Sequence, residues 1–139
     1  MRATADTQTA AVAGLFYPGD VAVLAREVQT LLAAAAQLKS PVGPPKALIV
    51  PHAGYIYSGP VAASAYAQLA VLRDRIRRVV LLGPTHRVYV RGLALPEADR
   101  FATPLGEIQL DVEGMERVSA LPQVTQSAAA HQMEHSLEV

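Results

Sequence analysis

The sequence predicts an α/β domain built on a mostly parallel sheet core with flanking helices. Two nearly continuous apolar runs, at residues 46–50 and 78–82, have the composition of strands buried on both faces of a parallel sheet. A helical pattern occupies residues 60–75 between them. Strand, helix and strand in this order predict a right-handed βαβ unit. The 139 residues are enough for one domain, spanning 1–139, with a hydrophobic core.

The N-terminal part predicts a loose start, a turn and a long helix. Residues 1–10 are small and polar and are expected to pack loosely. Residues 14–20 read as a turn that ends at Asp20, a residue type that caps helices. The helix expected over residues 21–37 has apolar side chains at helical spacing, namely Val21, Leu24, Val28, Leu31 and Leu32. The proline-rich stretch at 40–45 should end it.

Shorter elements follow the second predicted strand. Apolar segments at 92–95 and 106–110 precede a predicted helix over residues 112–120. Residues 131–139 look like the start of a further helix, and the sequence stops at an apolar residue inside it. Because helix ends need caps, this pattern suggests the N-terminal portion of a longer domain.

Composition excludes several classes of function. Twelve basic residues balance twelve acidic ones, and the run at 73–78 is interrupted by Asp74, so no nucleic-acid partner is expected. No apolar stretch is long enough to span a bilayer, so no membrane association is expected either. The sequence has no glycine-rich dinucleotide or phosphate loop, which argues against a nucleotide cofactor. It has no cysteine, which fits a cytoplasmic location and leaves His, Asp, Glu or Tyr as possible metal ligands.

Two histidines follow the two predicted strands. His52 lies two residues after the first strand, in Pro51-His52-Ala53-Gly54-Tyr55, and His86 ends Gly83-Pro84-Thr85-His86 after the second. Ligands gather at the carboxyl ends of parallel strands, so neighbouring strands would direct both imidazoles into one crevice. Imidazoles held on short Gly- and Pro-containing loops suit metal binding or acid–base work. A single loop histidine is more often a surface residue; the pairing at equivalent strand ends favours function.

Four other residues are candidates for the same crevice. Tyr55 and Tyr57 follow His52 and would either contact a ligand or cover the edge of the core. His131 and His135 lie four apart, a helical spacing that can bind zinc, but the Glu of a zincin helix is absent after His131. A contribution of Glu134 and His135 to the crevice is therefore favoured over a separate zinc helix.

These residues lie in segments that together resemble the Memo family. The segments occur in the family's order: Val12-Ala13-Gly14-Leu15-Phe16-Tyr17-Pro18, Val50-Pro51-His52-Ala53-Gly54-Tyr55-Ile56-Tyr57-Ser58-Gly59, Leu82-Gly83-Pro84-Thr85-His86, Thr103-Pro104-Leu105-Gly106, Asp111, and Glu134-His135-Ser136-Leu137-Glu138. The family resembles in fold the LigB-like class III extradiol dioxygenases, non-haem iron(II) enzymes that hold the metal with two histidines and a carboxylate.

The resemblance implies roles for individual residues. His52 and His86 match the family's first two pocket histidines, and Glu134 and His135 match its Glu-His-Ser segment. The family's later Ser-Asp-x-x-His segment and a cysteine beyond it have no counterpart in these 139 residues. The animal member is linked to motility signalling and to copper or iron, and microbial members accompany a radical-SAM protein and an AMMECR-type protein, the AmmeMemoRadiSam system.

Two functions from different classes follow. The first is a pocket in which His52 and His86 bind iron(II) or copper, with His52, His86 and His135 as catalytic residues of a dioxygenase-like oxidoreductase. The second is a non-enzymatic module that binds a peptide or small molecule in the same crevice through Tyr55, Tyr57 and Glu134. In either case the uncovered apolar surface of a partial domain would favour a homo-oligomer.

Overall fold

The computed structural model describes residues 6–37 and 43–139, and these form two compact units. The sheet unit combines the described residues up to Val12 with Leu82–Glu138, and the helical unit is Ala13–Leu81. The mixed α/β class predicted from the sequence is confirmed. Among the described residues, no helix has both the length and the apolar character needed to cross a bilayer.

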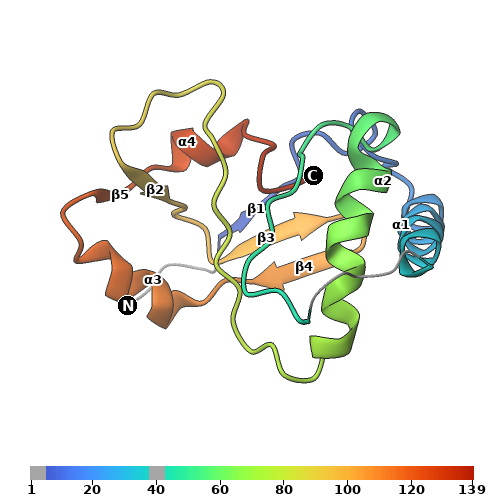
Figure 1. The fold of residues 1–139 in the computed structure, drawn as a ribbon. Coiled ribbons are helices and arrows are strands. Elements are labelled where there is room, and N and C mark those ends of the chain that lie inside the picture. The colour runs from blue at the N-terminus through green and yellow to red at the C-terminus, as the bar shows by residue number, and fades with distance from the viewer. Residues whose placement is uncertain (1–5, 38–42) are drawn as a thin grey trace. The chain divides into compact units, whose positions relative to one another are not determined.

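A three-stranded sheet organises the sheet unit. Its strand order is β1-β3-β4, in which β1 (Thr7–Gln8) runs parallel to β3 (Arg100–Thr103) and β3 runs antiparallel to β4 (Gly106–Gln109) (Figure 1). The turn at 103–106 closes the β3–β4 hairpin, and Gly106 has φ of 132°, a value that L residues rarely adopt. The N-terminal segment is thus not wholly loose, because β1 pairs through backbone hydrogen bonds that its composition did not predict; residues 1–5 lie outside the described part.

A second, two-stranded sheet lies in the same unit. β2 (Leu93–Leu95) and β5 (Val124–Gln126) pair in parallel, with α3 (Val112–Ser119) between them in sequence. The carboxylate of Asp111 caps α3 by accepting a hydrogen bond from Gly114 N at 2.9 Å. The predicted helix over 112–120 is confirmed, and the two short predicted segments contain β2 and β4.

The helical unit packs three helical segments around small and apolar side chains. α1 (Val21–Ala36) begins at Asp20, whose carboxylate accepts from Val23 N at 2.9 Å, as the sequence predicts. α2 (Tyr55–Tyr66) continues into a 3₁₀ segment, η1 (Ala67–Leu72) (Figure 1). α1 and α2 approach closely at Gly59, where an added Cβ would lie 3.0 Å from Leu31 Cδ1. The proline-rich stretch predicted to end α1 lies partly at 40–42, outside the described residues.

The start of α2 differs from the prediction. The sequence pattern placed the helix start at Pro60, but the helix begins at Tyr55 and contains Pro60. Ser58 lies inside this helix. It is buried, and its hydroxyl donates to the Ala53 carbonyl at 2.6 Å. The loop that carries His52 is thereby tied to the helix that follows it.

The two predicted core strands are the main correction. Residues 46–50 and 78–82 form no strand in the described structure, so the mostly parallel sheet core built on them is not present. Ile49 is fully exposed and Val80 is 78% exposed. Apolar composition shows that a segment tolerates burial, but a strand also needs a neighbour to hydrogen-bond with, and that neighbour is not encoded in the segment itself.

The C-terminal helix is also shorter than predicted. α4 spans Ala128–Gln132, capped by the hydroxyl of Ser127, which accepts from Ala130 N at 3.2 Å. Met133 ends the helix, so residues 133–139 form turns and not the start of a helix. His131 and His135 consequently do not share a helix face.

Candidate metal centre

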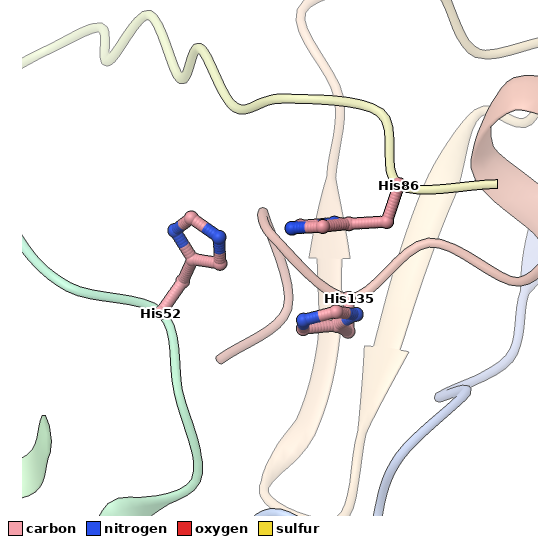
Figure 2. A group of neighbouring side chains, drawn as sticks. All are labelled: His52, His86 and His135. Atoms are coloured by element: carbon pink, nitrogen blue, oxygen red, sulfur yellow. The ribbon is translucent and has the colours of Figure 1, made fainter. Parts of the chain in front are cut away.

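His86 and His135 come together in the sheet unit. Their rings stack with centroids 4.5 Å apart and planes 18° apart (Figure 2). His86 lies on the irregular segment that precedes β2, and His135 lies on the turn beyond α4. The stacked pair places two ring systems with four nitrogens at one point of this unit, although 49 positions (135 − 86) separate the residues.

Glu134 connects the two histidine segments. Its Oε1 lies 2.7 Å from His86 Nδ1, and its Oε2 accepts a hydrogen bond from His86 N at 2.6 Å. Oε1 also accepts from the backbone N–H groups of His135 and Ser136, each at 2.9 Å. Burial raises the pKa of Glu134, but the hydrogen bonds from His86, Ser136 and His135 outweigh it and lower the pKa to about 2. The carboxylate is therefore ionised at neutral pH.

Ser136 adds a direct bond between the two segments. Its hydroxyl donates to the Pro84 carbonyl at 2.8 Å. The approach is close at Gly83, where an added Cβ would meet Ser136 Oγ at 2.5 Å and Leu137 Cδ2 at 2.9 Å. Sequence reasoning did not single out Ser136, and no spacing rule finds it, because 52 positions separate it from Pro84.

His52 lies in the helical unit, on the loop that leads into α2; its side chain is drawn in Figure 2. That loop approaches the turn at 14–20, where Tyr55 N donates to the Phe16 carbonyl at 2.8 Å. A Cβ on Gly54 would lie 3.2 Å from the same oxygen, so glycine allows this approach. The family-like segments at 12–18 and 50–59 thus contact each other.

Tyr55 and Tyr57 occupy different environments on the first turn of α2. The Tyr55 ring packs against Tyr17 with centroids 5.7 Å apart, whereas Tyr57 is 80% exposed. Of the two roles predicted for these residues, covering the core fits Tyr55, and the exposed phenol of Tyr57 is available to a ligand.

Alkaline pH should test the burial of Tyr55. Burial, followed by the negative charge of Glu27 and by Tyr66, raises the pKa of Tyr55 above its ordinary value of 10.0. Above pH 10 the unfolded chain ionises this phenol while the folded protein keeps it protonated, so folding stability should fall until pH passes the raised pKa. Urea unfolding between about pH 8 and 12, the range around the ordinary tyrosine pKa, should show this fall. Tyr55→Phe should reduce it, and Tyr57→Phe should leave it unchanged.

His131 has a structural role. It is buried, its Nε2 lies 3.0 Å from the Ala94 carbonyl, and its ring lies 6.2 Å from that of Phe101. These contacts hold α4 against β2 and β3. Because α4 ends at Gln132, His131 and His135 do not form the zinc-binding pair considered for one helix face.

The features described so far define a mixed α/β protein with a carboxylate-anchored histidine pair. The Memo-like protein family model matches residues 8–139. A MEMO1 family protein of Aquifex aeolicus is 38% identical over 129 residues, and one of Sulfurisphaera tokodaii is 39% identical over 140 residues. Each alignment covers 93% of this chain and 46% or 48% of the relative. The chain belongs to the Memo-like family, and it spans about half the length of the curated relatives it matches.

Proposed function

We propose that this chain supplies the histidine ligands of a redox-metal pocket in which His52 and His86 bind iron or copper and His135 is a third imidazole. Each of the three residues offers one ring nitrogen as a metal ligand. The observation that carries the proposal is the stacked His86–His135 pair, which a carboxylate holds in place. His52, on its short loop before α2, is included because it matches the first pocket histidine of the family pattern.

The donor set fits such a metal. Imidazole nitrogen suits iron, copper and zinc, and the chain has no thiolate that would compete as a soft ligand. Three protein ligands leave coordination positions for a substrate, as catalytic metal sites require. Imidazole donors with open coordination positions support the LigB-like, dioxygenase-type function expected from the family resemblance.

In the proposed reaction the bound metal would supply the oxidation–reduction chemistry. The protein residues would bind, orient and exchange protons. His86 would be held in one orientation by its Nδ1 contact with Glu134. His135, stacked on His86, would hold or move a proton on one of its ring nitrogens when that nitrogen is not engaged by the metal. Tyr57 would contact the substrate through its exposed phenol.

Metal titration tests the proposal. We expect the 139-residue protein to bind Fe(II) under anaerobic conditions, or Cu(II), with one dominant site in calorimetry. The His52→Ala/His86→Ala variant should bind more than about 100-fold more weakly, because losing ligands costs more than losing an outer-shell partner. His131→Gln is the control for histidine content, because His131 is buried and contacts the Ala94 carbonyl. The metal affinity of this variant should equal that of the wild-type protein. Equal affinity of the double variant and the wild-type protein would contradict the assignment.

A second candidate is a binding module without catalysis. Ile56 and Tyr57 are 85% and 80% exposed on the first turn of α2, and together they offer an apolar contact for a peptide or small molecule. Metal analysis of the freshly purified protein separates the two candidates. A stoichiometric metal that disappears in the His52→Ala/His86→Ala variant supports the metal pocket, whereas a metal-free protein with no metal affinity favours the binding module.

We also propose that the chain associates with itself. The four consecutive apolar residues from Val79 to Leu82 are 66%, 78%, 54% and 75% exposed, and an exposed apolar run commonly marks an interaction surface. Sedimentation velocity should show a dimer or larger species at micromolar concentration. Val80→Lys should shift the distribution toward monomer, while Tyr89→Lys, at a 90% exposed site outside this run, should not. A monomer at all concentrations would contradict this proposal.

A further inference from the structure

We propose that Glu134 is not a metal ligand but the positioning residue of His86, whose tautomer it fixes so that Nε2 is the nitrogen presented to the metal. The inference about metal presentation rests on the proposed metal site. The choice of tautomer rests only on contacts within the sheet unit, so it can be tested without any metal.

The first argument is the number of hydrogen bonds that Glu134 already accepts. Oε1 faces His86 Nδ1 and the backbone N–H groups of His135 and Ser136, and Oε2 accepts from the backbone N–H of His86. A carboxylate has about four lone-pair sites, two on each oxygen. Oε1, which faces three donors, is therefore fully engaged, whereas Oε2 accepts from one donor. A metal bound at Oε1 would have to displace one of the donors that orient the His86 ring and the turn at His135 and Ser136.

The second argument is burial. The Glu134 side chain is 8% exposed, whereas that of His86 is 39% exposed. The buried member of the pair is thus the carboxylate, and the accessible member is the imidazole. Breaking the contacts of a buried carboxylate leaves N–H groups unsatisfied, which is unfavourable. Glu134 thus holds the His86 ring from its buried side, while the ring itself stays accessible to a metal.

The third argument is the chemistry of the His86–Glu134 contact. An ionised carboxylate only accepts hydrogen bonds, so a 2.7 Å contact with Nδ1 requires the proton to be on Nδ1. In the neutral ring the lone pair is then on Nε2, the form that can bind a metal. Metal-binding histidines commonly donate their other ring N–H to a carboxylate, which fixes the tautomer and the ring orientation.

His86 is the ring that Glu134 controls, although His135 is its neighbour in sequence. His135 Nδ1 lies 3.7 Å from Oε1, beyond hydrogen-bond distance, while His86 Nδ1 lies at 2.7 Å. Glu134 contacts His135 through its backbone N–H and His86 through both backbone and ring. One carboxylate therefore sets the ring state of His86 and the backbone of the turn that carries His135.

Nitrogen NMR of the histidine-labelled, metal-free protein tests the tautomer. In mildly alkaline buffer the neutral form of the His86 ring should be predominantly the Nδ1–H tautomer. Glu134→Gln should shift His86 toward the Nε2–H form, because an amide can also donate to Nδ1. Glu138→Gln is the matched control, because Glu138 is a carboxylate in the same segment that accepts backbone N–H groups from Ala11 at 2.7 Å and Val12 at 3.0 Å. It should leave the His86 tautomer unchanged.

Calorimetric titration with Zn²⁺, a redox-inert probe, gives the second readout. Glu134→Gln should weaken binding by about 10- to 100-fold, the usual cost of losing an outer-shell partner, and Glu138→Gln should not change it. An Nε2–H tautomer of His86 in the wild-type protein would overturn the inference even if the variant did not fold. A Glu134→Gln protein with unchanged tautomer and affinity would overturn it as well. Failure of wild-type protein to bind any metal would refute the proposed function, while the metal-free spectra would still decide the effect of Glu134 on His86.

Discussion

Gly92→Ala should lower the free energy of unfolding by about 2–4 kcal/mol, combining backbone strain of about 1–3 kcal/mol with a steric clash. Gly92 has φ of 91°, and a Cβ there would collide with the Gln123 carbonyl oxygen. The same oxygen accepts a hydrogen bond from Leu93 N at 2.8 Å, next to the start of the β2–β5 pairing. Relieving the collision would therefore disturb the two-stranded sheet. Urea unfolding followed by circular dichroism measures the effect.

Gly14→Ala separates strain from collision. Gly14 has φ of 79°, close to that of Gly92, but a Cβ there meets nothing within 4 Å. It should cost about 1–2 kcal/mol, the penalty for the left-handed conformation alone. If Gly92→Ala cost no more than Gly14→Ala, the contact with Gln123 would have no energetic consequence.

Gly83→Ala should disturb both the stability of the protein and its proposed metal site. The new methyl group would lie 2.5 Å from Ser136 Oγ and 2.9 Å from Leu137 Cδ2, so both side chains must move. The hydrogen bond from Ser136 to Pro84 would then weaken, and the loop carrying His86 would shift from Glu134. We expect a loss of about 1–3 kcal/mol in urea unfolding, as for overpacking, and about tenfold weaker Zn²⁺ binding, as for loss of outer-shell support.

Two companion variants interpret this result. Ser136→Ala removes the hydroxyl and its hydrogen bond without adding an atom, so it measures the loss of that bond alone. Gly83→Ala/Ser136→Gly removes the Ser136 side chain, two of the three atoms nearest to the new methyl group, and should recover part of the lost affinity. If Gly83→Ala and Ser136→Ala lost the same stability and the same Zn²⁺ affinity, the added methyl group would have no effect beyond the loss of the Ser136–Pro84 hydrogen bond.

Local signals predicted two of the helices well. α1 and α3 each begin after an aspartate that caps the first turn, at Asp20 and Asp111, and their apolar residues recur at helical spacing. Both the cap and the spacing involve residues within a few positions of one another. The start of α2 was predicted five residues too late (60 − 55), and Pro60 lies inside the helix.

Strand pairing was predicted poorly. The segments richest in apolar residues, 46–50 and 78–82, form no strand, whereas the polar β1 pairs with β3 across more than 90 positions (100 − 7 = 93). The order of apolar and polar residues in a segment indicates which side chains can be buried. It does not specify which distant segment supplies the backbone hydrogen bonds that a strand needs. The sheet could therefore not be derived from composition.

The sequence by itself determined the candidate ligands and their loops: His52, His86 and His135, with glycine and proline placed where the backbone must turn. It determined them because residue chemistry and short-range turn signals are properties of local sequence. Only the tertiary structure decided that Glu134 contacts the His86 ring, since 48 positions separate them. It also decided that His131 is part of the core, because ring orientation and burial depend on packing between segments that are distant in the chain.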